Sequence, residues 1–412
     1  MSLEATAPPQ APPEPGAEPQ RSEPQPQRRL WDESFAYCLK IFVALRLGLW
    51  LIGVLAVGLL TPNSGLGDPV TPGWHNMFTA WNRWDVTWYL KIASHGYASN
   101  NGTAAFFPLY PGLVHALGVV FGRHWLVAAY LVSNLCFLAA MIVVYKLSQF
   151  EFDSHVARRT VLYMAVFPTS FFFLAPYSES LFLLLTVSTL FAARKQRWLT
   201  AGLLGIFAAL TRSIGVALIL PLGLEAMSQA GWLPHIKGAG RSLAKTAGAL
   251  AASILPAAGL LIYLGYWRIH SGDWLVPFKA QAGWARQFSW PWDTIVNGTK
   301  VGLQFIGSFP GGYHSVDLLL VTISFGAAIW VCRRTAPIYW SYTIVSLIVP
   351  LFLVFGGRPF MSLPRFVLML WPLFWALVAF ADRFKANQLV VAASAAGLGM
   401  LGLLFVNWYW VF

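Results

Sequence analysis

The sequence predicts an all-α, polytopic membrane protein with about eleven transmembrane helices. Composition is the first observation behind this prediction: 57% of the 412 residues are hydrophobic and only 11% are charged, whereas a soluble domain carries about 25% charged residues. The second is that the basic residues fall in twos and threes between long apolar runs, as membrane topology signals do. The 28 Lys and Arg against 16 Asp and Glu therefore indicate orientation in a membrane. A nucleic-acid partner is not predicted, because it would require basic residues clustered on one soluble domain.

Each predicted span is an apolar run close to the length that crosses the hydrocarbon core, about 20 residues or somewhat fewer. The runs are 39–60, 125–147, 159–175, 178–193, 198–211, 213–229, 246–267, 315–332, 337–355, 366–381 and 388–411. Residues 1–29 are rich in Pro, Gln, Glu and Ala and cannot bury a core, so we expect a disordered cytoplasmic tail. Residues 30–412 are predicted to form one transmembrane domain.

The basic residues of the short loops orient these spans, and the side that receives them should be cytoplasmic. They are Arg28, Arg29, Arg158, Arg159, Arg194, Lys195, Arg197, Lys237, Arg241, Lys245, Arg333, Arg334, Arg383 and Lys385. All fall on one side only if the run 106–122 does not cross the membrane. This short run contains two prolines and His115, so we expect an interfacial helix along the outer surface. If it spans instead, the count becomes about twelve.

With this topology, the remaining polar passages gather on the outer face. They are the first extracytoplasmic loop 61–124, the turns 175–180, 210–213 and 356–366, and a second large loop, 268–314. We therefore expect polar groups from distant parts of the chain to form one site at this surface.

The passage "NRWDVTWYLKIASHGY" (82–97) carries the first candidate, Asp85. In a helix, Asp85, Trp88 and Tyr89 share one face by their i, i+3 and i+4 spacing. Aromatic rings beside a carboxylate suit a sugar, and the acid could act as a general base. Trp84 and His95 of the same passage are further candidates for substrate binding. The alternative is an interfacial aromatic anchor with a solvated acid.

Glu179 is the only carboxylate in "FFFLAPYSESLFLLL", and we predict a catalytic role for it. An acid at the mouth of two apolar helices is costly to place, which favours a function. In the alternative reading, Ser178 or Glu179 starts the next helix and interacts with its positive dipole end. Tyr177 and Ser178 of the same turn are predicted to bind substrate.

Three arginines of the outer turns, Arg212, Arg358 and Arg365, are candidates for binding a lipid phosphate. A guanidinium binds phosphate bidentately and stays charged. Without a specific ligand, such arginines could instead reach the lipid headgroups. The sequence has no Gly-rich phosphate loop with Lys and Ser/Thr, no HExxH and no Cys pair, so neither a cofactor nor a protein-held metal is predicted.

Four stretches in order, "RWDVTWYLKIASHGY", "AAFFPLYPGLVHAL", "VFPTSFFFLAPYSESLFLLL" and "GIFAALTRSIGVAL", resemble the PIG-V family over about residues 40–225. This family comprises the GPI mannosyltransferase 2 type enzymes and their prokaryotic relatives. The resemblance implies a GT-C glycosyltransferase that takes mannose from a polyprenyl or dolichyl phosphate and transfers it with inversion. It places the essential acid at Asp85, the "AFFP" segment at Ala105 to Pro108 and the "YSES" turn at Tyr177 to Ser180.

The expected partners are a polyprenyl-phosphate-linked sugar donor, membrane lipids, and a glycolipid or protein acceptor. Short outer loops and the Pro-rich tail depart from the GPI enzymes, which favours a bacterial acceptor and a bacterial plasma membrane; in a eukaryote the site of action would be the endoplasmic reticulum membrane. An accessory subunit is not indicated. The alternatives are a same-fold transferase of another sugar, and a secondary transporter or lipid flippase, which would place ionisable groups near the midplane in repeated halves.

Overall fold

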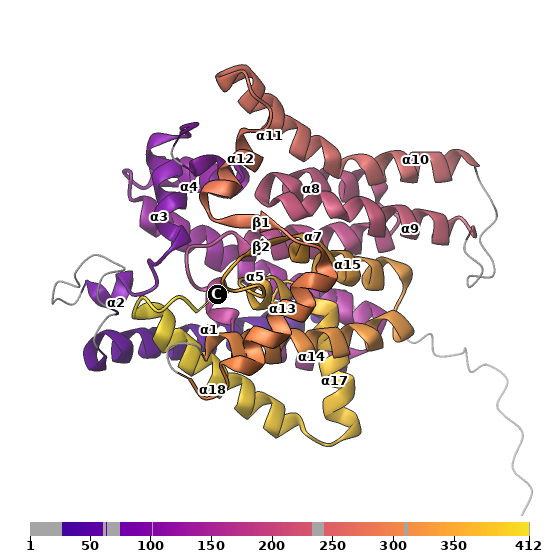
Figure 1. Cartoon of the computed structure of the whole chain (residues 1–412). Helices are drawn as coiled ribbons and strands as arrows, with labels where there is room; N and C mark the ends of the chain where they lie inside the picture. The colour runs from indigo at the N-terminus through magenta and orange to yellow at the C-terminus, as the bar shows by residue number, and fades with distance from the viewer. Residues whose placement is uncertain are drawn as a thin grey trace, which may run out of the picture.

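Helices run side by side along most of the molecule (Figure 1). The computed structural model describes residues 27–60, 63, 75–100, 102–232, 243–308 and 312–411. The longer helices are α1 (Gln27–Leu59), α5 (Trp125–Glu151), α6 (Ser154–Val166), α7 (Glu179–Arg194), α8 (Trp198–Thr211), α9 (Ile219–Gln229), α10 (Leu243–Ile254), α11 (Pro256–Ser271), α14 (Tyr313–Arg334), α15 (Pro337–Ile348), α17 (Trp371–Arg383) and α18 (Asn387–Val406). The shorter helices are α2 (Asn76–Thr79), α3 (Asp85–His95), α4 (Leu109–Val120), α12 (Val276–Gly283), α13 (Pro291–Gln304) and α16 (Leu363–Val367).

The protein is a multi-pass helical membrane protein. Among the described residues, five stretches are long and apolar enough to cross a membrane, namely Glu33–Leu59, Trp125–Glu151, Thr246–Ser271, Tyr313–Arg334 and Asn387–Val406. Large apolar side chains remain exposed along such stretches, including Leu261, Ile262 and Leu389. A soluble monomer rarely leaves so much apolar surface in water, whereas acyl chains solvate it well.

Each predicted span coincides with helical structure, but several spans are interrupted. The span 246–267 consists of α10 and α11, which are separate helices because Pro256 at the start of α11 lacks the backbone N–H that would continue α10. The span 337–355 ends its α-helix at Ile348 and continues as a 3₁₀ turn, Val349–Phe352. Of the predicted tail, residues 1–26 lie outside the described residues, and α1 already begins at Gln27.

The all-α prediction missed a small sheet. β1 (Arg286–Phe288) and β2 (Leu353–Phe355) pair antiparallel, with Arg286 opposite Phe355 and Phe288 opposite Leu353. The sheet ties the second large loop to the segment that follows α15. Strands of three residues are too short for the alternation by which a strand is recognised in a sequence.

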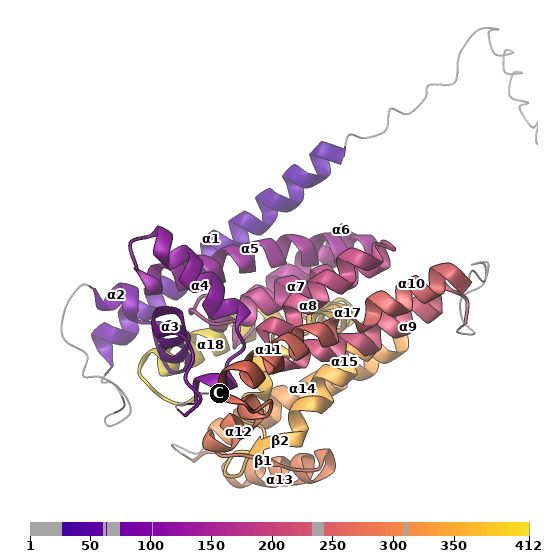
Figure 2. The ribbon, with the colours of Figure 1, turned by 90° about the horizontal axis from the view of Figure 1, so that it is seen from above.

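Several ion pairs lie at one end of the helix bundle. There, basic side chains of the α5–α6 and α7–α8 regions pair with acids: Arg158 with Glu33, Arg159 with Asp382, and Arg194 with Glu151 and Glu225. The α14–α15 and α17–α18 turns lie toward this end as well. Figures 1 and 2 show α3, α4 and α12 toward the opposite end.

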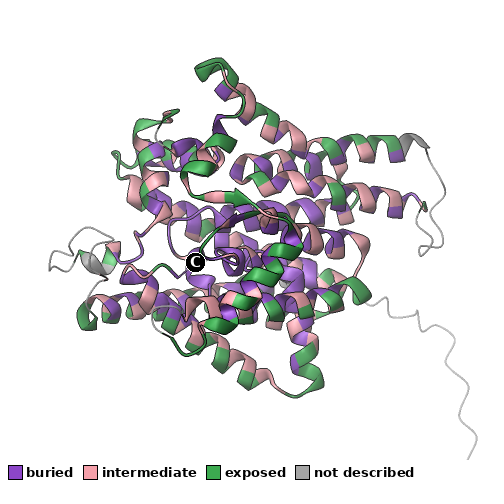
Figure 3. Ribbon diagram, in the orientation of Figure 1, coloured by how far each residue is buried: buried purple, intermediate pink, exposed green. Residues whose placement is uncertain are grey.

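The core lies between the helices that connect these ends. Trp371 and Trp375 of α17 are its largest fully buried side chains, together with Tyr110, Tyr145 and Tyr163. Figure 3 shows the buried residues in the centre of the bundle and exposed residues on its outer helices and loops. The site described next lies where this core meets the loops.

Candidate active site

Asp85 is the first residue of α3. The chain turns sharply into this helix, because Trp84 has a positive φ of 56°, a backbone conformation that is uncommon outside glycine. The acid is favoured at this position by the partial positive charge of the helix N-terminus. The side chain of Asp85 is 29% exposed and lines a cavity.

Arg365 joins Asp85 to Glu179. Its Nη1 donates to Oδ2 of Asp85 at 2.7 Å, and its Nε donates to Oε1 of Glu179. The three residues come from α3, α7 and α16. The expected convergence of an outer-loop acid, the 175–180 turn and the 356–366 turn is therefore present in the fold.

Glu179 lies behind the arginines and not on the cavity wall. Its side chain is fully buried, and its Oε1 also accepts a hydrogen bond from Nη1 of Arg212 at 2.7 Å. Of the predicted roles for Glu179, contact with substrate is not favoured by this position, whereas support of Asp85 through Arg365 is, because two guanidinium groups donate to its Oε1. A buried carboxylate paired with two arginines holds both of them in place.

A layer of hydroxyl groups surrounds this cluster. The Tyr89 hydroxyl and the Ser178 Oγ are 2.9 Å apart, and Arg212 Nη1 donates to the same Oγ at 3.2 Å. Tyr177 donates to the backbone carbonyl of Arg83 at 3.0 Å, while the Arg365 guanidinium lies 4.5 Å from the centre of the Tyr177 ring. Burial raises the pKa of Tyr89 to about 12, so this phenol remains protonated at neutral pH.

The cavity beside the cluster has a volume of about 790 Å³. Its lining includes the charged side chains Asp85, Arg212, Arg286 and Arg365. It also includes a set of largely apolar residues: Tyr342, Val349, Pro350, Leu353, Phe366, Met369 and Leu370. The cavity can therefore take a ligand with a charged end and a long apolar end.

Aromatic side chains line the cavity on both sides of Asp85. Trp88 stacks on Phe106 and meets Trp284 edge-on, with ring centres 6.0 and 5.0 Å away. Trp84, on the other side of the acid, packs against Trp408 and Trp410. The predicted residues Trp84, Trp88, Tyr89 and Tyr177 therefore all line the cavity, while Ser178 lies just behind it.

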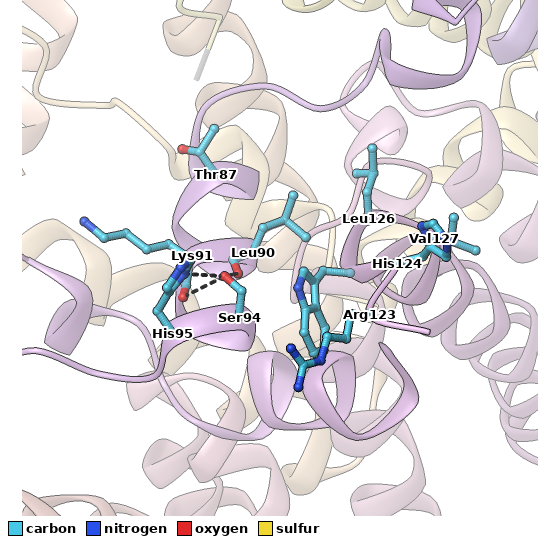
Figure 4. Close-up of a pocket in the computed structure, with 10 residues that line it drawn as sticks. Thr87, Leu90, Lys91, Ser94, His95, Arg123, His124, Leu126 and Val127 are labelled. Atoms are coloured by element: carbon cyan, nitrogen blue, oxygen red, sulfur yellow. Dashed lines mark hydrogen bonds between the residues drawn. The ribbon is translucent and has the colours of Figure 1, made fainter. Parts of the chain in front are cut away.

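His95 does not lie at this cavity. It is at the other end of α3, about 15 Å along the helix axis from Asp85, and its Nδ1 is 2.7 Å from the Ser94 Oγ. Figure 4 shows it in a separate, shallow pocket of about 530 Å³ with Lys91 and Arg123. His95 was predicted to bind substrate because it is close to Asp85 in the sequence. The two residues lie at opposite ends of α3, so this prediction is corrected.

Arg358 is also removed from the predicted phosphate-binding set. Its Nε and Nη2 donate to the two carboxylate oxygens of Asp317 at 2.6 and 2.9 Å. It also donates to the backbone carbonyls of Trp410 and Val411 at 2.8 and 2.5 Å. Asp317 is buried in α14, and an unpaired charge there would be costly, so Arg358 is turned away from the cavity.

Arg286 was missed by the sequence reading. Its guanidinium lines the cavity and donates to the Ser362 Oγ at 3.2 Å. Burial and the nearby Arg365 and Arg212 lower the pKa of Arg286, while Asp85 raises it. Within the described ranges, Arg286 forms no ion pair, unlike Arg212 and Arg365. The available signal was a basic residue between two tryptophans, Trp284 and Trp290, in a loop that the topology rule predicts to be extracytoplasmic.

Among the described residues, no three His, Cys, Asp or Glu side chains come together in a way that could hold a metal ion.

Residues 58–231 match the family model described as mannosyltransferase (PIG-V). The resemblance to the PIG-V family is confirmed. The matched range contains Asp85, Glu179 and Arg212, whereas Arg286 and Arg365 lie beyond it.

Two curated relatives agree with this match. GPI mannosyltransferase 2 from Drosophila pseudoobscura pseudoobscura is 37% identical over 109 residues, which are 24% of this chain and 24% of that protein. GPI alpha-1,6-mannosyltransferase 2 from Mus musculus is 31% identical over 165 residues, which are 37% of this chain and 32% of that protein. The chain therefore covers only a quarter to a third of the length of these relatives.

Among solved structures, a crystal structure of the Archaeoglobus fulgidus oligosaccharyltransferase is similar, with a TM-score of 0.43 and 14% sequence identity. The alignment covers 91% of this chain and 55% of that chain.

Proposed function

We propose that this chain is a membrane mannosyltransferase of the GT-C type. It would transfer a mannosyl residue from a polyprenyl (dolichyl) phosphate donor to an extracytoplasmic lipid or protein acceptor, with inversion at the anomeric carbon. The main support is the bridge from Arg365 to both Asp85 and Glu179, beside a cavity lined by both charged and apolar side chains. The match of residues 58–231 to the PIG-V model supports mannose as the sugar.

The charges at the cavity favour a donor with an anionic phosphate. Asp85 and Glu179 counter Arg365 and Arg212, so Arg286 supplies the remaining positive charge. We assign the donor phosphate to Arg286, with Arg365 and Arg212 beside it, since a guanidinium binds phosphate oxygens through parallel hydrogen bonds. The isoprenoid chain would then lie along the apolar residues that line the cavity.

Transfer would proceed in one displacement step. The Asp85 carboxylate takes the proton of the acceptor hydroxyl while that oxygen forms a bond to the anomeric carbon. The bond between the anomeric carbon and the phosphate oxygen breaks, and the lipid phosphate leaves with the electron pair. The arginines stabilise the charge that develops on this leaving group, and Glu179 positions two of them.

The basic residues in the short turns support the orientation. These turns, rich in Arg and Lys, would lie in the cytoplasm, and the cavity would then lie on the extracytoplasmic face. We retain about eleven spans for this arrangement, with α4 lying along the outer surface.

The test is transfer by the purified protein. We would incubate it with polyprenyl-phosphate-mannose and a membrane extract and identify the mannosylated product by mass spectrometry. Asp85→Asn should reduce the rate by about 10²–10⁴, which is the usual contribution of a general base, and should still bind the donor. Asp293→Asn is the matched control, because Asp293 is exposed in α13 and does not line the cavity.

Two results would contradict the proposal. Turnover by Asp85→Asn at the rate of the unchanged protein would reject this acid as the base. Transfer of another sugar from a panel of polyprenyl-phosphate sugars, with none of mannose, would reject the assigned sugar and keep the reaction class.

A further inference from the structure

The segment 407–411, which follows α18, forms one wall of the cavity. Trp408 and Trp410 of this segment line it. Their rings lie 5.5 and 5.9 Å from the ring of Trp84, the residue directly before Asp85. Trp410 remains 43% exposed although it stacks on Trp84, so part of its surface is available to a ligand.

Side chains of other elements hold this segment in place. Arg358 donates to the carbonyls of Trp410 and Val411 while it pairs with Asp317. We call Arg358 and Asp317 the latch. Near the start of the segment, the Nε of Arg83 donates to the carbonyl of Val406 at 2.8 Å. Backbone hydrogen bonds from Trp408 and Tyr409 to the end of α18 add to these contacts, so the charged groups act on a segment that the backbone also holds.

The wall also adjoins the arginine assigned to the donor phosphate. Arg286 pairs with Phe355 across the two-stranded sheet. The Phe355 ring lies 5.4 Å from the ring of Trp410. A sugar joined to a phosphate at Arg286 would therefore have Trp410 within reach on one side and Asp85 ahead of it.

We propose that Trp408 and Trp410 bind the sugar ring of the donor, and that the latch positions them. The apolar face of a pyranose packs on an indole ring, which offers a large, rigid apolar surface. This inference rests on the proposed function. The wall lies outside the range matched by the family model, residues 58–231.

Donor binding tests the wall without turnover. We would measure the dissociation constant of polyprenyl-phosphate-mannose with the Asp85→Asn protein, alone and combined with Trp410→Ala, Trp408→Ala or Trp410→Phe. The alanine variants should each weaken binding by roughly three- to tenfold, and Trp410→Phe by less, because a ring remains. Trp292→Ala is the control, since Trp292 is 59% exposed on α13 and lies outside the cavity.

The latch is tested by a double-mutant cycle in the protein that retains Asp85. Arg358→Lys should raise the donor KM with little change in kcat, since lysine cannot hold Asp317 and two carbonyls together. If Arg358 acts through Trp408 and Trp410, its effect on KM should largely disappear in a background where both tryptophans are replaced by alanine. Additive effects on KM would reject the latch, and thermal unfolding would confirm that each variant is folded.

Different experimental results would reject the wall and the proposed function. Unchanged donor binding by both alanine variants, with transfer lost only in Asp85→Asn, would reject the wall and keep the proposed function. A raised KM for the acceptor alone would reject the assignment to the donor sugar. Absence of transfer from any polyprenyl-phosphate sugar by the unchanged protein would reject the proposed function and the wall with it.

Discussion

Among the described residues, the arginines Arg212, Arg286 and Arg365 line the cavity. They differ in whether a carboxylate lies at hydrogen-bonding distance. Arg212 and Arg365 each face a carboxylate at hydrogen-bonding distance, whereas Arg286 donates to a serine hydroxyl. An arginine already paired with a carboxylate has to share its charge with a new anion. Arg286 has no such competitor among the described residues and should contribute most to binding an anionic donor.

Arg286→Ala should raise the donor KM by about ten- to hundredfold, because a hydrogen bond to a charged group contributes roughly 1.5–3 kcal/mol. Arg286→Lys should recover only part of this loss, since an ammonium group cannot reproduce the fork of a guanidinium. Steady-state kinetics over a donor series would measure both effects. Arg268→Ala is a matched control, as Arg268 is an exposed arginine at the end of α11. An unchanged donor KM in Arg286→Ala would argue against its role.

At the residue scale, the acids were easier to single out in the sequence than the bases. Asp85 and Glu179 could be singled out because a carboxylate among apolar residues has few structural reasons to be there. An arginine among apolar residues often has a structural role, since it can reach lipid headgroups or pair with a buried acid. Arg358 has such a role, and its partner Asp317 lies in a predicted span far along the chain, so only the fold could separate it from Arg365.

At the scale of the elements, hydropathy predicted where the helices lie, because lipid requires every backbone group to be bonded internally. It did not predict where proline interrupts them, as at Pro256, or the strands that position Arg286. The wall at 407–411 was also missed. Such segments are held by long-range side-chain contacts and leave no periodic signal in the sequence.

The contact between α8 and α11 gives a prediction at this scale. A Cβ added at Gly259 of α11 would lie 2.3 Å from the carbonyl oxygen of Ile206 and 2.8 Å from the Cβ of Ala209. Small residues allow membrane helices to approach closely, so Gly259→Ala should force the helices apart and cost about 1–3 kcal/mol. Thermal unfolding in detergent would report this as a lower Tm.

The same helix supplies the control for this experiment. Gly265 of α11 has no atom within 4 Å of an added Cβ, so Gly265→Ala should leave the Tm unchanged or raise it slightly, given the higher helix propensity of alanine. Equal effects of the two substitutions would show that the close approach at Gly259 does not limit stability.

At the scale of the whole molecule, the proposed orientation depends on the basic turns and the cavity lying at opposite ends of the bundle. Gln287 is exposed beside Arg286, and Lys385 is exposed in the α17–α18 turn. If the basic turns face the cytoplasm, these two positions must lie on opposite sides of the membrane, although both are open to water.

Cysteine labelling would measure this separation in intact cells. In a protein carrying Cys332→Ser, because Cys332 is the exposed native cysteine among the described residues, a membrane-impermeant maleimide should label Gln287→Cys at once. It should label Lys385→Cys only after the cells are lysed. The reverse pattern would place the cavity in the cytoplasm, where Asp85 could not act on an extracytoplasmic acceptor. Labelling of both positions before lysis would mean that the two ends do not lie across a membrane from one another, and the number of spans between them would have to be even.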